Sequence, residues 1–452
     1  MRFITVLAWA AATVATFLAS AAPAEDWPQW RGPRFNGSTL EKGLPETFSK
    51  SESVAWTALL PGPSAATPIV WGDRVFLSST EPTTKGLVAM CLRAADGQVL
   101  WRKRLGADTK VDRNTLASPS PVTDGRLAYF LFGSGDLAAL DFAGHVVWSR
   151  NLVKDFGNLA LKYGYSSSPL LLGDQPSPSQ AGPATAGGGR LYVAVLRRPK
   201  PYRGEAGAAT LDSFLLAIDA ATGKDVWKEV RLTQANDESH ESYATPVPCE
   251  REGRQEILMA GGDCVTSSDP TTGKELWRLA YNPSRDGMWR LIPSVVTFDD
   301  LVLAVTPRGK ALMAIRPAGT GTLAADRIAW TFTGHTSDSA TPLLYDGRLY
   351  VLDSDAKVMT CLDPKTGRER WHGSLGGAVW RASPTGADGR IWCLSEDGEV
   401  AVLAAGDQFK VLARVALGDG PAQASIAVAN QHLYIRTASR LTCIGKPLAP
   451  PR

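Results

Sequence analysis

Charged and aromatic side chains gather in short polar stretches of this 452-residue chain, most of which lie just before a proline-led apolar segment. A carboxylate beside an imidazole can orient or charge it, and an arginine can hold an anion through two parallel hydrogen bonds. These stretches therefore predict a binding site for a protein segment or a small anionic ligand. The candidate residues are Tyr165, His240, Glu241, Tyr243, Arg290, His335, Asp338 and Arg381.

Other interpretations of the same residues stay open. The groups can satisfy one another and ordered water around a wet channel without holding a ligand. As a zinc site they lack local ligand spacing, because His240 and His335 are the only histidines in these stretches and the carboxylates are scattered. We predict no metal site and assign no catalytic residue.

A repeated unit must position these stretches. One half of the unit has a proline, then an Asp-Gly turn between β-rich runs, as at Asp346-Gly347 and Asp388-Gly389, which is typical of a tight hairpin. In the other half a glycine precedes a tryptophan by four residues, and five such pairs fall at the same place within the unit. These pairs are Gly97 and Trp101, Gly144 and Trp148, Gly223 and Trp227, Gly273 and Trp277, and Gly367 and Trp371.

The leading residues of the units, Pro68, Pro121, Pro169, Pro246, Pro293, Pro342, Pro384 and Ile426, count eight units of four strands each. Such a repeat predicts an all-β fold, an eight-bladed β-propeller of four-stranded antiparallel blades over residues 53–447, with tryptophans between the blades. The eighth unit lacks its last strand, so the N-terminal strand Val54–Thr57 is expected to close the ring. Blade three carries a surface insertion within 173–213.

The Ala-x-Asp-x-x-Thr-Gly-x-x-x-Trp unit around Asp219 to Trp227 resembles the tryptophan-docking repeat of the pyrroloquinoline-quinone (PQQ) propeller superfamily. That superfamily includes PQQ-dependent alcohol dehydrogenases and a non-enzymatic scaffold for outer-membrane protein assembly. The opening Trp27-Pro28-Gln29-Trp30-Arg31-Gly32-Pro33 is similar to that of secreted, planctomycete-type members. Blade five departs from the pattern because no glycine stands four residues before Trp330, and blade seven has Ala413 where tryptophan is expected.

The resemblance implies two possible functions. The one we favour is a non-catalytic binding or scaffold module that uses one face of its channel. The alternative is a PQQ-dependent oxidoreductase with Ca²⁺, in which Glu241 or Asp338 acts as the base and His240, Arg290 and Arg381 hold the quinone. The chain has no Cys-Cys pair of the kind that the dehydrogenases place against the cofactor, and no Cys-x-x-Cys-His haem attachment. PQQ therefore stays an open possibility and not a predicted cofactor.

Residues 1–24 read as a secretory signal: Met1 and Arg2, an apolar run from Phe3 to Leu18, and small residues that end at Ala24. This predicts a periplasmic or secreted protein without a membrane span, and without a lipid anchor because no cysteine lies in the segment. The 48 Lys and Arg against 45 Asp and Glu argue against nucleic acid as a partner.

Three smaller features complete the sequence prediction. The Trp-rich lead segment 25–52 is expected to pack as a plug against the propeller flank. The six cysteines are expected to form no disulfide framework, with Cys249 and Cys264 on the first and third strands of blade four. Arg197, Arg198, Lys200 and Arg203 are expected to form an exposed basic loop.

Overall fold

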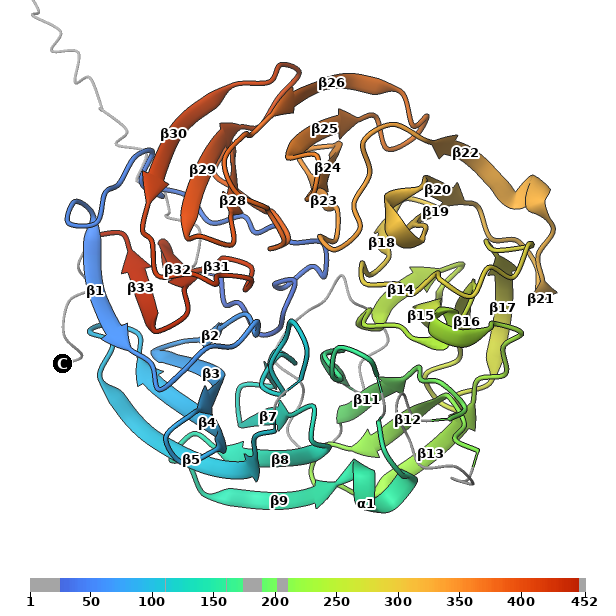
Figure 1. The fold of residues 1–452 in the computed structure, drawn as a ribbon, viewed down its shortest axis with the longest axis horizontal. Coiled ribbons are helices and arrows are strands. Elements are labelled where there is room, and N and C mark those ends of the chain that lie inside the picture. The colour runs from blue at the N-terminus through green and yellow to red at the C-terminus, as the bar shows by residue number, and fades with distance from the viewer. Residues whose placement is uncertain (1–24, 110, 160, 174–188, 201–209, 447–452) are drawn as a thin grey trace, which may run out of the picture.

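Eight antiparallel sheets stand around a central channel in this computed structural model, which describes residues 25–446 except 110, 160, 174–188 and 201–209 (Figure 1). The predicted eight-bladed propeller is confirmed. Its last blade is completed by the N-terminal strand β1 (Val54–Leu59), which pairs with β33 (Arg440–Ile444). Among the described residues no helix has the length and apolar character that a membrane span requires. The predicted signal and most of the blade-three insertion lie outside the described residues.

Each blade runs from an innermost strand at the channel to an outermost strand at the circumference. Blade one comprises β2 (Ile69–Trp71), β3 (Arg74–Glu81), β4 (Gly86–Arg93) and β5 (Val99–Ala107). Blade two comprises β6 (Val122–Thr123), β7 (Leu127–Leu131), β8 (Asp136–Asp141) and β9 (Val146–Asn151). Blade three comprises β10 (Leu170–Gly173), β11 (Gly189–Val195), β12 (Phe214–Asp219) and β13 (Asp225–Val230). Blade four comprises β14 (Val247–Arg251), β15 (Arg254–Gly261), β16 (Cys264–Ser268) and β17 (Glu275–Ala280), with β21 (Gly321–Thr322) added in parallel at its edge.

The second half of the ring repeats this order. Blade five comprises β18 (Val296–Phe298), β19 (Leu301–Val305), β20 (Leu312–Ile315) and β22 (Ile328–Phe332). Blade six comprises β23 (Leu343–Tyr345), β24 (Arg348–Asp353), β25 (Val358–Leu362) and β26 (Glu369–Ser374). Blade seven comprises β27 (Thr385–Ala387), β28 (Arg390–Leu394), β29 (Glu399–Ala404) and β30 (Val411–Ala416), and blade eight β31 (Ala427–Ala429), β32 (His432–Arg436), β33 and β1. The short helices are α1 (Leu152–Phe156), η2 (Asp237–His240), η3 (Pro307–Gly309) and η4 (Ala325–Arg327).

The repeated glycine and tryptophan meet between neighbouring blades. Trp148, on the outermost strand of blade two, lies against Gly223 in the turn of blade three, where a Cβ atom would come within 2.6 Å of the indole. The indole Nε1 donates to the carbonyl of Ala220 at 2.8 Å. Glycine is needed here both for this close approach and for its φ of +72°. The glycine therefore serves the tryptophan of the preceding blade and not the one four residues after it.

The seam between blades four and five has no such glycine. Trp277 of blade four is fully buried, and its Nε1 donates instead to Oε2 of Glu256 in its own blade at 3.0 Å. Glu256 also pairs with Arg251 and Arg254, which balances the charge of this buried carboxylate. The departure that the sequence shows in blade five is thus accommodated by a different set of contacts.

Hydroxyl groups link the blades where the innermost strands begin. The backbone N–H of Ser120 donates to Oγ of Ser168, that of Ser168 to Thr245, and that of Thr245 to Ser294, at 2.8 to 3.0 Å. Equivalent bonds join Ser294 to Thr341, Thr341 to Ser383, Ser425 to Thr67 and Thr67 to Ser120. In the other blades that begin with a proline, the serine or threonine that accepts this bond directly precedes the leading proline of the unit. In blade five, Ser294 follows Pro293 instead. The predicted leading residue of blade five was therefore wrong by two positions, and Val295 takes that place.

The N-terminal segment crosses the channel and does not pack on the flank, so this part of the prediction was wrong (Figure 1). Trp27 and Val70 of blade one exchange both backbone hydrogen bonds, and Thr39 N–H donates to Gly386 of blade seven. Arg31 is 3% exposed and donates to the carbonyls of Pro342 and Pro384, in blades six and seven. Backbone amides and carbonyls of the innermost strands need hydrogen-bond partners in the channel, and the segment supplies them at these positions. Side chains add further contacts, such as the Leu44 N–H donating to Oδ2 of Asp388 at 3.1 Å.

Candidate functional site

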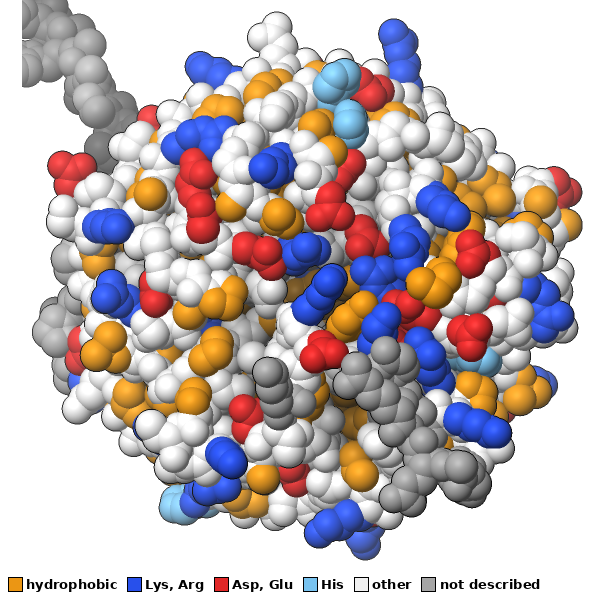
Figure 2. All heavy atoms as spheres, in the orientation of Figure 1, with side chains coloured by type: hydrophobic (Ala, Val, Ile, Leu, Met, Phe, Trp, Pro, Cys, Tyr) orange, Lys and Arg blue, Asp and Glu red, His pale blue; other side chains and the backbone are white. Residues whose placement is uncertain are grey.

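The connections between blades converge at the end of the channel opposite the hairpins that the N-terminal segment contacts. We call this the open end, and the end covered by the N-terminal segment the closed end. Figure 2 shows Lys and Arg side chains intermixed with Asp and Glu around the centre of the ring. Residues 241 to 243 are held there by backbone bonds to both sides, from Ser242 N–H to Leu196 and from Tyr243 N–H to Leu291. These two isolated bridges tie the segment to blade three on one side and to the connection into blade five on the other.

Arg290 joins three connections of the open end. Its Nη2 lies 2.9 Å from Oδ2 of Asp338, and its Nε lies 3.6 Å from Oε1 of Glu238 on η2. Lys162 Nζ approaches the other oxygen of Glu238 at 3.8 Å. Burial lowers the pKa of Arg290, but the carboxylates of Asp338 and Glu238 outweigh it and raise the pKa above its usual value. The guanidinium is therefore firmly charged and already balanced by two carboxylates.

Glu241 is fully buried beside this group and uses both carboxylate oxygens. Oε1 pairs with Arg198, and Oε2 accepts the Tyr243 hydroxyl at 2.9 Å and the Lys162 N–H at 3.2 Å. Residues 241 and 243 lie on one side of an extended segment, which brings the two side chains together. Burial and the neighbouring Glu241 charge raise the pKa of Tyr243 well above its usual range. We call Lys162, Arg198, Glu238, Glu241, Tyr243, Arg290 and Asp338 the mouth network.

Two predicted residues stand beside the mouth network with other partners. Tyr165 is 2% exposed in the hydrophobic core of blades two and three, and its hydroxyl donates to the Ala194 carbonyl at 2.9 Å. His240 ends η2 and is half-buried, and burial together with the Arg198 charge lowers its pKa. Neither side chain hydrogen-bonds to Arg290 or Asp338, so both stand outside the mouth network.

The last two predicted residues lie in separate ion pairs. Arg381 Nε lies 3.0 Å from Oε1 of Glu396, and its Nη2 lies 3.8 Å from Asp355. His335 does not meet Asp338, which the sequence placed beside it. Its Nδ1 lies 3.3 Å from Oδ2 of Asp353, and its ring stands 6.0 Å from that of His372. Of the eight predicted residues, four therefore belong to the mouth network, Tyr165 and His240 stand beside it, and Arg381 and His335 have other partners.

Three members of the mouth network were not among the predicted site residues. Lys162 and Glu238 occur in the same polar stretches as Tyr163 and His240. Their position shortly before the leading proline of a unit could therefore have identified them as site residues. Arg198 was expected in an exposed basic loop, yet its side chain is only 17% exposed and pairs with Glu241. Arg197 is also buried and donates to four backbone carbonyls. No local pattern in the sequence distinguishes these two arginines from Lys200, which is exposed.

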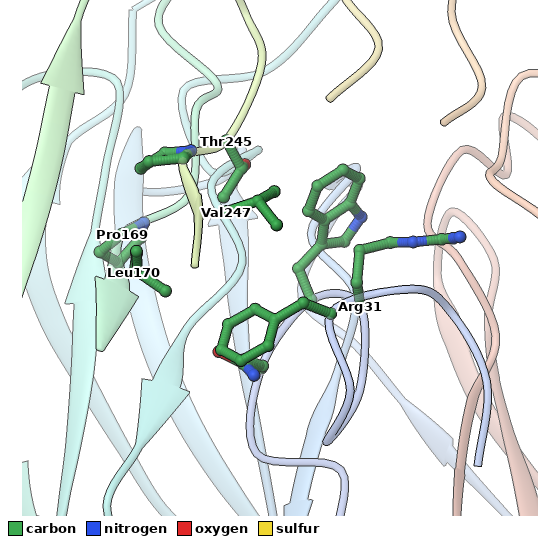
Figure 3. A pocket seen from close by; sticks show the side chains of 9 residues that line it. Arg31, Pro169, Leu170, Thr245 and Val247 are labelled. Carbon is green, nitrogen blue, oxygen red and sulfur yellow. The ribbon is translucent and has the colours of Figure 1, made fainter. Parts of the chain in front are cut away.

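Below the mouth network the N-terminal segment forms one wall of a small pocket (Figure 3). Pro169, Leu170, Thr245 and Val247 line one side, and Arg31 extends away from them on the other side. Burial lowers the pKa of Arg31 to about 9. The pocket is bounded largely by aliphatic and aromatic groups, among them Trp30 and Phe35. It therefore resembles a packing defect beside the N-terminal segment more than a ligand-binding site.

Metal-binding and redox groups are sparse in the described part of the chain. It contains no group of three or more His, Cys, Asp or Glu side chains placed to hold a metal ion. The six cysteines are free thiols, with Cys249 on β14 and Cys264 on β16 as predicted. Burial raises the pKa of the Cys249 thiol to about 11, which disfavours the reactive thiolate.

Comparison with known proteins places the repeat in one family. Residues 48–175, 171–331 and 264–411 match the model of the outer membrane protein assembly factor BamB. A curated relative, a polyvinylalcohol dehydrogenase of Sphingopyxis sp. (strain 113P3), is 25% identical over 246 residues. That match spans 53% of this chain but only 32% of the relative, so the two proteins correspond over about a third of the dehydrogenase.

The solved structures with similar folds include both a BamB protein and dehydrogenases. BamB from Moraxella catarrhalis has a TM-score of 0.58 at 15% identity, over 86% of this chain and 97% of that chain. The quinohemoprotein alcohol dehydrogenase from Comamonas testosteroni has a TM-score of 0.63 at 12% identity, over 96% and 83%. A europium-containing methanol dehydrogenase has a TM-score of 0.65 at 12% identity, over 92% and 90%. At these identities the likeness establishes the propeller fold alone.

Proposed function

The chain belongs to the family of the outer membrane protein assembly factor BamB, and on that premise we propose that it is a binding and scaffold module. It is exported through residues 1–24 to the periplasm or the cell exterior. A protein segment docks at the open end of its channel, and the protein carries out no chemistry of its own. The relatives named as dehydrogenases make an oxidoreductase the alternative.

The observation that supports binding is the mouth network itself. Arg290 bridges Glu238 and Asp338, which come from the connections into blades four and six. Both partners are side chains, and the groups are partly accessible, at 15% exposure for Arg290 and 19% for Asp338. A charged segment of a partner can replace either member of such an ion pair without breaking backbone hydrogen bonds. Mixed charges favour recognition and orientation of a polar protein surface.

The same observation disfavours PQQ at the open end. PQQ carries three carboxylates and needs cations whose charge is not already balanced. Here Arg198, Arg290 and Arg381 each face a carboxylate of the chain, at Glu241, Asp338 and Glu396. Binding the cofactor at these arginines would place its carboxylates close to the carboxylates of Glu241, Asp338 and Glu396, and these like charges would repel one another. The residues present therefore fit the quinone poorly, and no reaction step is assigned to them.

Site-specific photo-crosslinking tests the docking proposal. A photoreactive amino acid at Met288, which is 51% exposed in the connection that carries Arg290, is compared with one at Leu412, 38% exposed on β30 at the circumference. In cells that export the protein, we expect a discrete protein adduct at position 288 only. The double variant Arg290→Ala, Arg381→Ala should lose the adduct while keeping its melting temperature within a few degrees.

A matched control uses ion pairs of the same kind at the circumference. Arg348 on β24 and Arg370 on β26 both pair with Asp407, which is not a member of the mouth network. The double variant Arg348→Ala, Arg370→Ala should keep the adduct. Equal crosslinking at positions 288 and 412, or an adduct that survives loss of Arg290 and Arg381, would exclude the open end as the docking surface.

The oxidoreductase alternative has its own experiment. Purified protein is incubated with PQQ and Ca²⁺, then assayed for dye reduction with alcohols or sugars and for its melting temperature. We expect neither dye reduction nor a raised melting temperature. A rise of several degrees, lost in the Arg290→Ala, Arg381→Ala variant, would establish the quinoprotein function instead.

A further inference from the structure

Two histidines from different elements lie side by side on the surface of blade six. His335 belongs to the connection that leads into the blade, and His372 lies on β26, the outermost strand. Their ring centroids are 6.0 Å apart and the ring planes are inclined by 56°. Both side chains are open to solvent, with exposed fractions of 46% and 57%. Neither ring is needed to fill the core.

Each imidazole has a carboxylate on the same ring nitrogen. Nδ1 of His335 lies 3.3 Å from Oδ2 of Asp353, and Nδ1 of His372 lies 2.7 Å from Oε1 of Glu369. A carboxylate that accepts the Nδ1 proton selects the tautomer whose Nε2 carries the lone pair. Metal-binding histidines generally have this arrangement, since the carboxylate orients the ring and increases its basicity. Both imidazoles are thus prepared to donate from Nε2.

The spacing of the rings suits one shared ion. An ion bound to an imidazole nitrogen lies about 3 Å from the ring centroid, because Zn–N bonds are about 2.0–2.1 Å long. Two rings that share the ion can therefore have centroids up to roughly 6 Å apart. The observed separation of 6.0 Å lies at this limit, both side chains are exposed, and the charges of Asp353 and Glu369 favour a cation nearby.

We propose that His335 and His372 form a surface site for one divalent transition-metal ion of the kind that imidazole prefers, Cu²⁺ or Zn²⁺. The described residues supply no third His, Cys, Asp or Glu ligand in position. Water completes the coordination, so the ion is exchangeable and open to a further ligand. The site is separate from the mouth network and does not depend on the docking function.

Titration of the full-length exported protein, without a polyhistidine tag, with CuCl₂ or ZnCl₂ tests the site. Isothermal titration calorimetry at pH 7.5 should give one saturable site per chain. The variants His335→Gln and His372→Gln should each weaken binding at least about tenfold, and Asp353→Asn about tenfold, the usual effect of removing such a carboxylate.

His145 provides the matched control. Its Nδ1 lies 2.9 Å from Asp141 and its side chain is 80% exposed, so it shares the carboxylate pairing but forms no ring pair with a second histidine. His145→Gln should leave the affinity unchanged, and electron paramagnetic resonance of the Cu²⁺ complex should show two nitrogen ligands. The proposal fails if no saturable binding occurs, if either blade-six variant binds as tightly as the parent, or if His145→Gln causes an equal loss.

Discussion

The two ends of the channel are built from different kinds of contact. At the closed end, Trp27, Arg31 and Thr39 bind backbone amides and carbonyls of the innermost strands. At the open end, Arg290, Glu238 and Asp338 bind each other through side chains. Backbone groups are present in every blade and cannot be exchanged for those of a partner, whereas a side-chain ion pair can be. We therefore expect the closed end to contribute mainly to stability, and the difference supports the proposal that the open end serves recognition.

Removal of the largest side chain of the closed end should have the largest effect. Trp27 is fully buried in the core cluster of blades one, seven and eight. Trp27→Ala should lower the free energy of unfolding by about 3–5 kcal/mol, since it removes the buried area and leaves a cavity. Urea unfolding followed by circular dichroism measures the change. Trp289, next to Arg290 in the connection into blade five, is only partly buried. Trp289→Ala should therefore cost less than about 1 kcal/mol, and a cost equal to that of Trp27→Ala would contradict the distinction between the two ends.

Replacing Arg31 at the closed end should lower the free energy of unfolding more than replacing Arg290 at the open end. Arg31→Ala leaves the carbonyls of Pro342 and Pro384 without their donor inside the channel, so we expect a loss of about 2–3 kcal/mol. Arg290→Ala should cost about 1 kcal/mol, because its carboxylate partners are near solvent or retain Lys162. Denaturant midpoints of the two variants measured side by side give the comparison. A larger loss for Arg290→Ala would reverse it.

Salt sharpens the comparison further. A double-mutant cycle of Arg290→Ala and Asp338→Ala should give a coupling free energy of about 1 kcal/mol at low ionic strength. Raising NaCl to about 1 M should reduce this coupling, since the screening length falls to roughly 3 Å. The loss caused by Trp27→Ala should not shrink in the same way. Coupling that does not change with salt would mean that the pair is not accessible enough to be exchanged for a partner.

The smallest expected effect is a pH dependence at the open end. Burial and the Arg198 charge lower the pKa of His240 in the folded protein, so the unfolded chain binds the proton more readily. Stability contributed by neutral His240 is present above about pH 6.5, the value for an unperturbed histidine, and is lost as the pH falls below it. His240→Gln should flatten the fall of the melting temperature between pH 7 and pH 5. Parallel curves for variant and parent would exclude this assignment.

Much of the fold could be predicted because its signals are local. The Asp-Gly turn at Asp346-Gly347 specifies a hairpin through residues that tolerate positive φ, and both have it here, at 51° and 67°. The four-residue spacing of glycine and tryptophan identified the blades, although Gly223 in fact receives Trp148 of the preceding blade and not Trp227. Spacing along the chain reveals a repeat but not which neighbour each repeat contacts.

The candidate site was predicted less completely for the same reason. Glu241, Tyr243, Arg290 and Asp338 were placed at one end of the channel because each lies shortly before the leading proline of a unit. It did not show that Arg198 turns inward to Glu241, or that His335 meets His372 and Asp353 in place of Asp338. Partners between 15 and 50 residues apart depend on the rotation of each blade about the axis, which no local pattern contains.

By itself the sequence determined the number of blades, the four strands of each blade and the closure by an N-terminal strand that begins at Val54, because turn residues and apolar alternation act between neighbours in the chain. Only the tertiary structure decided that residues 25–46 cover the channel, that the charges at the other end balance one another, and that two histidines stand together on blade six. Those contacts join side chains and backbone groups from different blades, and their energies depend on distances that exist only once the ring is closed.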